Sequence, residues 1–342
     1  DVSPEHPVTI SKFESHAREI EFDAVAYKGD VKLFAITEHI ENAGVHSGDA
    51  TLVIPPQWIT SEIMAKVRTI GELLAKELNI TGPFNVQMLS RDHDVKVIEC
   101  NLRASRSFPY ISKALGINFI TEATSLMLAG KTTRKINVNE VMNIKYVVVK
   151  SPQFSFSRLK GADPRLGVEM ASTGEVACFG SDRSEALLAS LISSGFRIPK
   201  RGVFISLEQE GDRPGFSSQA SLLMMNELKL YATPETAEVF KKLGVECKSV
   251  SIADMIKNNN HEPLIEFLKS GKVDLIISIP GPGRVYTSQE GYLLRRLAVD
   301  LEISLLTDLR LTKASIQAMS SHEEKDIMIK SWQEYHKEYA LV

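Results

Sequence analysis

The sequence predicts two domains: a first half of α+β type built on antiparallel strands, and a second half of α/β type with a doubly wound parallel sheet. The length of 342 residues exceeds what a single hydrophobic core usually serves. Residues 8–37 consist of short segments in which apolar and polar residues alternate, as they do in antiparallel strands. After about residue 200, apolar segments alternate with helical patterns, which is typical of parallel strands and crossover helices.

The composition is that of an ordinary globular protein. Hydrophobic residues make up 43% of the chain and charged residues 24%. The net charge of −3 gives no overall electrostatic reason to bind nucleic acid or an anionic membrane, and no apolar run approaches the roughly 20 residues of a membrane-spanning helix. The three cysteines match no metal-ligand spacing, which indicates free thiols in a reducing compartment. Because the chain begins at Asp1 and enters a strand-like segment almost at once, we expect it to be a fragment.

The first domain is expected to alternate strand pairs with helices. Strands are predicted for residues 8–13, 18–27 and 31–39, with a turn at 28–30. Apolar residues at helical spacing predict a helix from Thr60 to Leu78, with Thr60 or Ser61 as its cap. A second strand pair, 84–90 and 95–101, is followed by a helix that begins near Phe108.

The remaining segments complete the domain plan. Residues 131–165 are polar and contain proline around one apolar strand, so we interpret residues 131–200 as a connecting region packed on residues 1–130. The turn signal at 199–202 marks the start of the α/β domain, 201–330, and residues 331–342 form a tail. The parallel strands of this domain are predicted at 202–207, 229–232, 247–252, 273–279 and 303–308.

One strand face of the first domain carries polar residues suited to a cation. A turn centred on His93 would place Gln87 opposite Glu99 and Asn85 opposite Asn101. Gln87, Glu99 and Asn101 then offer only oxygen donors, which suit Mg²⁺ or Mn²⁺ bridging the phosphates of a nucleotide. An ordinary solvated strand face is the alternative from these residues alone.

Two arginines follow this strand in a serine-rich turn. Arg103 and Arg106 come two and five residues after Asn101. Their guanidinium groups suit the binding of an anion and the neutralisation of charge during phosphoryl transfer. Ion pairing with nearby acids is the alternative.

Taken together, E-C-N-L-R-A-S-R-S at 99–107 resembles the metal-binding strand of the ATP-grasp enzymes, and in particular of the carbamoyl phosphate synthetase large subunit. Further segments resemble the later, carbamate-phosphorylating half of that family: 38–50, 82–87, 150–159 and 167–180. The resemblance implies that residues 1–200 are the end of an ATP-grasp synthetase unit. It also implies that residues 201–330 are the regulatory domain of the family, which is methylglyoxal synthase-like.

The resemblance also implies roles for individual residues. Gln87, Glu99 and Asn101 would ligate two Mg²⁺ or Mn²⁺ ions, with Gln87 and Glu99 also contacting ATP, and Arg103 and Arg106 would bind the phosphoryl group or carbamate. Glu19 would hold the ribose of ATP, although alternating acids at 19–23 by themselves suggest a solvated strand. The nucleotide and carbamate pocket would be lined by Gly44, Val45, His46 and Ser47, and for His46 alone a packing or capping role is the alternative. K⁺ is a further cofactor of the family.

In the second domain, ligands are expected beyond the carboxyl ends of the strands. Thr233 and Thr236 lie where a strand gives way to a helix and resemble the effector-binding threonines of the regulatory domain. Helix capping is their alternative. Ser278 and Arg284 belong to a segment that departs from the Asn-rich pattern of relatives that bind N-acetylglutamate. We therefore expect a small anionic effector other than N-acetylglutamate.

In the whole enzyme we expect bicarbonate, ammonia and two ATP to give carbamoyl phosphate, with a glutaminase subunit or domain as partner and no activity from this fragment alone. The motifs look eukaryotic, so the protein is expected in the mitochondrion or the cytoplasm. We expect the arginine or urea type of synthetase, since no further pyrimidine-pathway segment follows. Another ATP-grasp ligase, such as a biotin-dependent carboxylase, is the nearest rival, but it would continue with Q-V-E-H where this chain has A-S-R-S. A non-catalytic effector-binding protein of this family is the alternative from another class.

Overall fold

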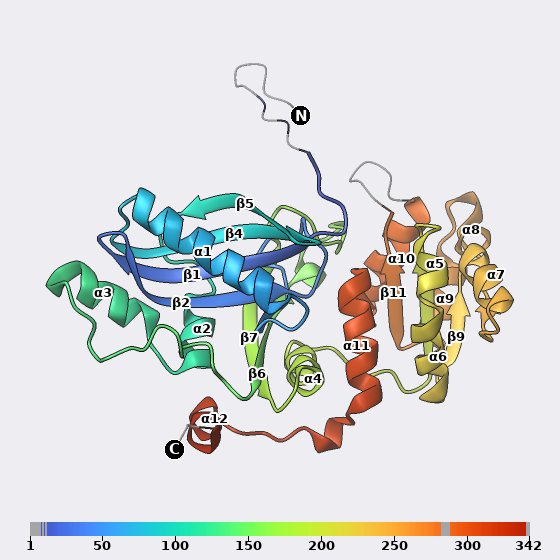
Figure 1. The fold of residues 1–342 in the computed structure, drawn as a ribbon. Helices are drawn as coiled ribbons and strands as arrows, with labels where there is room; N and C mark the ends of the chain where they lie inside the picture. Colours follow the sequence, from blue (N-terminus) through green and yellow to red (C-terminus); the bar gives the residue numbers. More distant parts are fainter. Residues whose placement is uncertain (1–7, 9, 11, 282–287, 340–342) are drawn as a thin grey trace.

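The computed structural model describes residues 8, 10, 12–281 and 288–339, and its secondary structure forms two sheets with helices on their faces (Figure 1). The first sheet has seven strands, all antiparallel, in the order β5-β4-β1-β2-β3-β6-β7. Its strands are β1 (Arg18–Tyr27), β2 (Asp30–His39), β3 (Leu52–Ile54), β4 (Gly82–Arg91), β5 (Asp94–Asn101), β6 (Val147–Phe154) and β7 (Ser172–Gly180).

Helices cover both faces of the β1, β2 and β4 part of this sheet. Helix α1 (Ser61–Glu77) packs on one face, and α3 (Phe119–Ala129), which follows α2 (Phe108–Leu115), contacts β1 and β4. Thr60 caps α1 as predicted, because its side chain accepts a hydrogen bond from the Ile63 N–H. Ile20, Phe22 and Ala24 of β1 belong to the core beneath α1, whereas Val25 belongs to the core beneath α2 and α3.

The segment 131–200 contributes strands to this same sheet. Strand β6 pairs with β3, and β7 pairs with β6. A short helix η1 (Phe156–Arg158) lies between them, and α4 (Arg183–Ser193) follows β7 and packs on both. The sequence pattern indicated only one strand here. The second strand, β7, is buried only at its two ends, and its interior residues are exposed or partly exposed.

The predicted strand at residues 8–13 does not form among its described residues, Val8, Ile10, Lys12 and Phe13, which are exposed and belong to no strand. The apolar and polar alternation is present there, but no neighbouring strand offers hydrogen bonds, so the pattern has no sheet to join. The next two predicted strands are confirmed as β1 and β2. Their turn contains Lys28 and Gly29, both with positive φ, as a two-residue hairpin requires.

The β4-β5 hairpin, which carries the polar face, has the predicted register near Gln87, but its turn is shorter than predicted and a bulge compensates for the difference. Its turn is Asp92-His93, since Arg91 pairs with Asp94, and this alone would shift all pairs by one residue. A β-bulge between Gln87 and Met88 adds one residue and restores the pairing of Gln87 with Glu99. The predicted pairs of Gln87 and Asn85 are therefore confirmed, although the three-residue turn behind the prediction is wrong.

The second sheet is fully parallel, with the order β10-β9-β8-β11-β12. Its strands are β8 (Gly202–Leu207), β9 (Lys229–Ala232), β10 (Lys248–Ser249), β11 (Leu275–Ile279) and β12 (Ser304–Leu306). They lie within the five predicted segments. The helices between and after them are α5 (Asp212–Gly215), α6 (Ser217–Met225), α7 (Pro234–Lys242), α8 (Ile252–Met255), η2 (Lys257–Asn259), α9 (Glu262–Lys269), α10 (Gln289–Asp300) and α11 (Leu309–Ser321). The doubly wound α/β prediction is confirmed.

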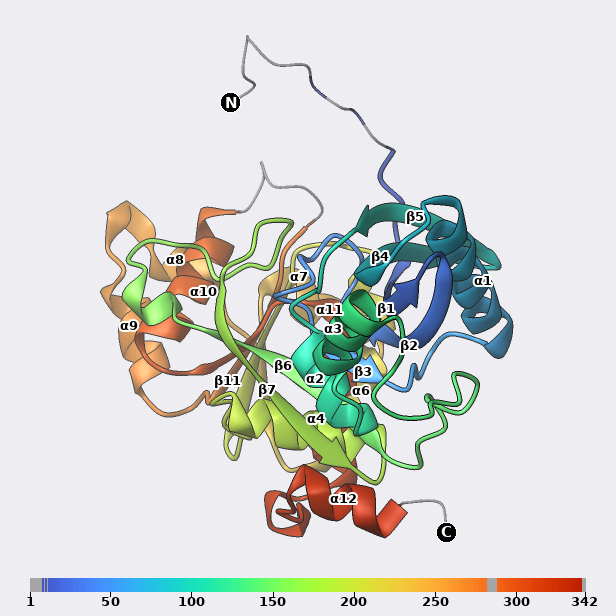
Figure 2. The ribbon, with the colours of Figure 1, turned by 90° about the vertical axis from the view of Figure 1, so that its left-hand side faces the viewer.

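The two sheets are joined through one apolar core. Val149 of β6 and Leu188 of α4 belong to the same buried cluster as Ile205 of β8 and Ile316 of α11. Helix α11 packs directly against α4, between the sheets (Figure 1). After η3 (Glu324–Asp326), the chain returns to the first sheet, where α12 (Trp332–Tyr339) lies below β6 and β7 (Figure 2).

Candidate active site

A small cavity collects seven of the residues predicted from the sequence. Its volume is about 80 Å³, and its predicted lining residues are His46, Ser47, Gln87, Glu99, Asn101, Arg103 and Arg106. They come from the loop after β2, from the β4-β5 hairpin and from the turn after β5. The hairpin register explains part of this, because paired residues of antiparallel strands share a face.

The oxygen donors of the hairpin are arranged to accept a hard cation. The Asn101 side-chain amide donates to Glu99 Oε1 at 2.7 Å, and the Gln87 amide donates to Ser47 Oγ at 3.2 Å. Both amide nitrogens are therefore turned toward protein, which leaves the amide oxygens for a ligand. Within the described residues, no three or more His, Cys, Asp or Glu side chains form a metal-binding group. One carboxylate with two amide oxygens nevertheless fits Mg²⁺, which usually takes few protein ligands and shares the phosphates of its substrate.

The two arginines are not neutralised by carboxylates in the part of the chain described. Arg103 donates to the Ala104 carbonyl oxygen at 3.2 Å, and Arg106 contacts the Met170 sulfur. Both side chains are exposed at the edge of the cavity, and neither makes an ion pair with a described residue. The ion-pairing alternative therefore finds no support, and both guanidinium groups are available to an anion.

The loop 44–50 is held in place by backbone hydrogen bonds. The His46 N–H donates to the Gly167 carbonyl oxygen at 2.8 Å, and His46 Nδ1 accepts from the Gly48 N–H at 3.0 Å. Asp49 is fully buried and accepts from the Ala171 and Ser172 N–H groups at 2.8 and 2.9 Å. These contacts pin the loop to the start of β7, so that His46 and Ser47 face the cavity from a fixed backbone.

Three predicted residues lie outside the lining of the cavity. These are Glu19, Gly44 and Val45. Glu19 accepts a weak hydrogen bond from the Gly44 N–H at 3.4 Å, so these two residues lie together. Val45 packs against the core beneath α2 and α3. Burial raises the pKa of Glu19, although nearby His39 opposes this effect.

A buried polar layer that the sequence pattern did not reveal supports the site from below. Glu19, Glu21 and Asp23 alternate along β1 as solvated acids would, yet they are only 5%, 2% and 0% exposed. Glu21 pairs with Gln87, and Asp23 pairs with Asn85, so the acids extend the polar face of the hairpin onto β1. The interpretation of this strand face as solvated is wrong, because the turn after β5 and side chains from the neighbouring strands β2 and β4 contact these acids.

Donors converge on these acids. The Asn85 amide donates to Glu21 Oε2 at 3.1 Å and to Asp23 Oδ1 at 2.8 Å. The hydroxyl groups of Ser105 and Ser107 each donate to Asp23 at 2.6 Å. Because Ser105 lies between Arg103 and Arg106, this bond anchors the turn that carries both guanidinium groups. The serines of the turn, together with acids two residues apart on β1, are the signal that could have predicted this contact.

Charge within the layer is shared unequally. Burial and the neighbouring charge of Glu21 raise the pKa of Asp23 to about 7. Burial opposes ionisation of Glu21 as well, but its hydrogen bond with His39, at 2.9 Å, lowers the pKa of Glu21 below its usual value. Of these two neighbours, Glu21 is thus held as a carboxylate, whereas Asp23 is readily protonated.

Lys150 is a further residue of the cavity without an assigned role. Its side chain is only 2% exposed, and its ammonium group donates to the carbonyl oxygens of Ser47 and Gly48 at 3.2 and 3.4 Å. Burial lowers the pKa of Lys150, and Glu175, 3.8 Å away, partly opposes this. Lys150 therefore ties the 44–50 loop to β6. Its place in an apolar strand gave no sign of this contact.

In the second domain, the predicted effector residues lie at the strand ends. The Thr233 hydroxyl donates to Thr236 Oγ1 at 3.0 Å, and Thr236 Oγ1 also accepts from the Leu207 N–H at 3.4 Å. Thr233 occupies the N-cap position of α7 but makes no side-chain capping bond, so the capping alternative is wrong for its hydroxyl. Ser278 is buried and accepts from Arg295 at 3.4 Å. Arg284 lies outside the described residues.

A carboxylate already lies at the carboxyl ends of β8 and β11. Glu208 accepts from the Gly281 N–H at 2.9 Å and from the Ser288 hydroxyl at 3.1 Å, and it lies 3.8 Å from Arg295. An anion bound at these strand ends would meet the negative charge of Glu208. This residue lies one position after the predicted strand 202–207, where a lone acid carried no signal.

Comparison with known proteins matches both halves of the chain. Residues 3–133 match the family model described as the carbamoyl-phosphate synthase L chain, ATP binding domain. Residues 218–307 match the model described as the MGS-like domain. The first half of the chain is thus similar to an ATP-binding synthase domain, and the second half to an MGS-like α/β domain.

Curated relatives contain both parts in the same order as this chain. The multifunctional protein ura1 of Schizosaccharomyces pombe is 43% identical over 323 residues, which cover 93% of this chain and 14% of that protein. The human mitochondrial carbamoyl-phosphate synthase [ammonia] is 42% identical over 329 residues, which cover 95% of this chain and 22% of that protein. The chain therefore spans less than a quarter of these relatives. Among solved structures, the biotin carboxylase subunit of pyruvate carboxylase has a TM-score of 0.43 and 15% identity over 53% of this chain and 46% of that one, too distant to bear on function.

This chain belongs to the carbamoyl-phosphate synthase family and corresponds to a region that holds an ATP-binding domain and an MGS-like domain. The multifunctional and mitochondrial relatives are similar to it to nearly the same extent, so identity does not separate the two branches. No helix among the described residues is long and apolar enough to cross a membrane.

Proposed function

We propose that this chain forms the metal-binding and anion-binding side of a site where carbamate takes the γ-phosphoryl group of MgATP, giving carbamoyl phosphate. The observation that carries the proposal is the shared cavity, in which the oxygen donors of Glu99, Gln87 and Asn101 face two guanidinium groups without carboxylate partners. Bound Mg²⁺ or Mn²⁺ would neutralise phosphate charge and orient the γ-phosphoryl group. The K⁺ ion that the resemblance implies has no ligands assigned among these residues.

The residues of the chain contribute mainly position and charge. Arg103 and Arg106 would bind oxygens of carbamate or of the transferred phosphoryl group and stabilise the charge that develops on them. The serine contacts to Asp23 fix the turn that presents both arginines, which reduces the entropy lost on binding. Glu19 would accept a hydrogen bond from the ribose, and the 44–50 loop, held by Asp49 and Lys150, would close one wall of the pocket.

The complete enzyme would supply what this segment does not. We propose bicarbonate and ammonia as the sources of carbamate, a glutaminase subunit or domain as a partner, and a mitochondrial or cytoplasmic location. The segment alone would not turn over, because most of each relative lies outside the matched region. Residues 1–130 and 131–200 would form the synthetase part and its connecting region, and residues 201–330 the effector domain.

Glu99→Gln tests this proposal in the full-length enzyme. A neutral amide cannot replace a carboxylate that ligates a phosphate-bound metal, so both carbamoyl phosphate formation and the partial reaction that makes ATP from ADP and carbamoyl phosphate should be lost. Glu77→Gln, at the exposed end of α1, serves as the charge-matched control and should keep both activities. A wild-type rate of the partial reaction in Glu99→Gln would remove Glu99 from the metal site.

For the second domain, we propose a small phosphorylated or carboxylated effector at the strand ends. The observations in support are that Thr233 is partly exposed and that no side chain caps the start of α7. The test is calorimetry on the 342-residue chain with a panel of nucleotides and N-acetylglutamate. Thr233→Val should make the binding free energy of a bound nucleotide less favourable by about 1 kcal/mol or more. Glu208→Gln should strengthen binding, because it removes the competing charge. Tight binding of N-acetylglutamate would contradict the proposed effector class.

A further inference from the structure

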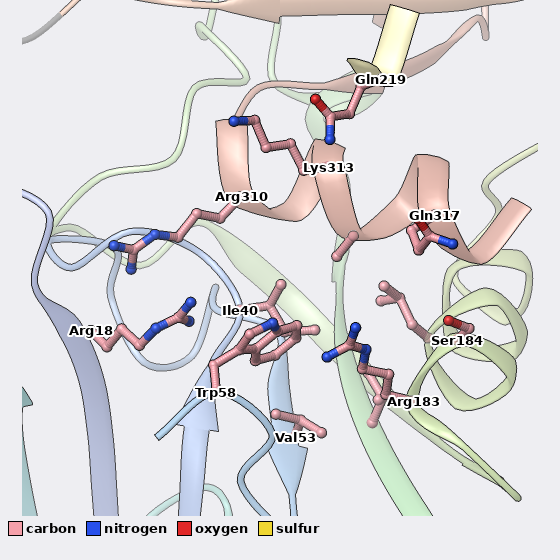
Figure 3. Close-up of a pocket in the computed structure, with 13 residues that line it drawn as sticks. Arg18, Ile40, Val53, Trp58, Arg183, Ser184, Gln219, Arg310, Lys313 and Gln317 are labelled. Atoms are coloured by element: carbon pink, nitrogen blue, oxygen red, sulfur yellow. The ribbon is translucent and has the colours of Figure 1, made fainter. Parts of the chain in front are cut away.

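A cavity lined by four basic side chains lies between the two domains. Its volume is about 270 Å³. Arg18 of β1 and Arg183 at the start of α4 belong to the first domain, and Arg310 and Lys313 of α11 belong to the second (Figure 3). Trp58, in the loop before α1, forms its floor. We call this space the basic cavity.

The basic cavity and the active-site cavity lie on opposite faces of the first sheet. Leu52 of β3 and Lys150 of β6 line the active-site cavity, whereas their neighbours Val53 and Val149 line the basic cavity. Successive residues of a strand point to opposite faces, so the two cavities are separated by one sheet. The basic cavity is therefore distinct from the metal and carbamate site, and it lies beside the start of α11, the helix that follows β12.

The positive charges around this cavity are poorly compensated. Arg18 lies 3.2 Å from Glu38 Oε1, the one ion pair that the structure describes for the four cations. Arg310 instead donates to the carbonyl oxygens of Ala17 and His16 at 3.1 and 2.7 Å, which satisfies its N–H groups without cancelling its charge. Asp308 and Glu38 act on Arg310, and Asp212 acts on Lys313, only from beyond ion-pair distance.

The Trp58 ring holds two of the cations in place, and the cations repel one another. The guanidinium carbons of Arg18 and Arg183 each lie 5.2 Å from the centroid of the Trp58 ring (Figure 3). Such cation–π contacts keep both planar groups in place without neutralising them. Burial, followed by the charge of Arg18, lowers the pKa of Arg310, which is the expected effect of like charges brought together.

The space extends beyond the basic cavity. A neighbouring cavity of about 350 Å³ shares Arg18, Trp58 and Arg310 and adds His16 and Arg91, together with the acid Asp92. Two amide side chains also line the basic cavity: Gln317 from α11, the helix of Arg310 and Lys313, and Gln219 from α6, near Lys313 (Figure 3). The combined lining offers fixed guanidinium forks, one ammonium group and neutral donors around a space large enough for a small molecule.

We propose that the basic cavity binds a small polyanion that carries phosphate groups, and that this anion joins the synthetase part to the MGS-like domain. Arginine forks match the oxygens of phosphate in bidentate geometry, and several converging cations favour a ligand of two or more negative charges. Because Arg183 and Lys313 come from different domains, the bound anion would offset the repulsion across their interface and strengthen it.

Inorganic pyrophosphate is the probe for this site. The chain contains two tryptophans, so Trp332→Phe leaves Trp58 as the single emitter beside the cavity. Titration of this variant at low salt should change the Trp58 emission with a Kd below about 1 mM, and calorimetry on the unmodified chain should give the same Kd. Arg183→Gln and Lys313→Gln should each weaken binding about tenfold, since each removes a charge-assisted contact.

The controls distinguish this site from general charge effects and from the strand ends. Lys269→Gln changes the same net charge on exposed α9 and should leave the Kd unchanged. Arg183 is exposed and Lys313 is partly exposed, so both variants should keep their unfolding midpoints, and Arg183→Lys should recover part of the affinity. Absence of both a heat signal and an emission change on adding pyrophosphate would overturn the proposal, and so would citrate binding as tightly as pyrophosphate. It would also be overturned if Lys269→Gln weakened pyrophosphate binding as much as Arg183→Gln, or if Thr233→Val abolished binding while Arg183→Gln did not.

Discussion

Asp23 shows how single residues beneath the site determine its charge. Its carboxyl group is fully buried and receives donors from Asn85, Ser105 and Ser107. These donors favour the ionised form, but burial and the nearby Glu21 outweigh them and raise the pKa to about 7. The folded protein thus retains a proton at Asp23 that the unfolded chain releases near pH 4.

This difference predicts a dependence of stability on pH. Where the native state binds more protons than the unfolded state, the free energy of unfolding falls as pH rises, here between about pH 4 and 7. Asp23→Asn removes this group and should flatten the decline by roughly 2 to 4 kcal/mol in urea unfolding measured across that range. Asp94→Asn, an exposed acid, serves as the control and should leave the slope unchanged. An unaltered slope in Asp23→Asn would show that Asp23 is ionised throughout.

At the scale of elements, helix α12 packs on the first domain through Tyr335. Helix α12 places Tyr335 against Tyr146 and Phe179, with ring centroids 6.1 and 5.2 Å apart. The Tyr335 hydroxyl donates to the Phe179 carbonyl oxygen at 3.3 Å, and the side chain is only 4% exposed. The predicted tail is thus a helix that covers the end of β7, far along the sequence from the domain it packs on.

Removing the aromatic contact should therefore destabilise the first domain. Tyr335→Ala is expected to lower the free energy of unfolding by about 2 kcal/mol or more, because it leaves a cavity beside two aromatic rings. Lys337→Ala, on the exposed side of α12, is the matched control. Urea unfolding monitored by far-ultraviolet circular dichroism measures both, and equal stabilities would mean that α12 is not docked in solution.

At the scale of the whole molecule, one apolar core joins the two sheets. Val149 and Leu188 from the synthetase side are buried in the same cluster as Ile205 and Ile316 from the MGS-like side. A polar interface would allow the domains to unfold separately, whereas a shared core ties the stability of each to the other.

Calorimetry should accordingly show a single cooperative unfolding transition for the 342-residue chain. Ile316→Ala, at a fully buried position of α11, should lower the stability of the whole chain by about 2 to 5 kcal/mol and keep one transition. Gln317→Ala, the exposed neighbour, should shift the midpoint little. Two transitions, only one of them moved by Ile316→Ala, would show that the domains unfold independently.

The sequence alone determined the elements whose signals are local. The second sheet could be predicted strand by strand, because buried parallel strands are continuous apolar runs separated by helical spacing. The α1 helix and its Thr60 cap depend on contacts within a few residues, and so does the β4-β5 hairpin. The residues of the candidate site could be predicted for the same reason, since most of them lie on that hairpin or directly after it.

Only the tertiary structure decided which strand faces are buried and which alternating segments join a sheet. The acids of β1 have the same alternation whether they face water or a buried layer, and contacts from distant residues, such as Asn85 and the turn at Ser105 and Ser107, make them internal. The exposed segment at residues 8–13 shows the reverse case, an alternating pattern without a partner strand. The basic cavity likewise exists only because α11 approaches β1 and α4, bringing Arg310 and Lys313 to Arg18 and Arg183. Burial and charge compensation are sums over residues distant in sequence, and local patterns carry no information about those sums.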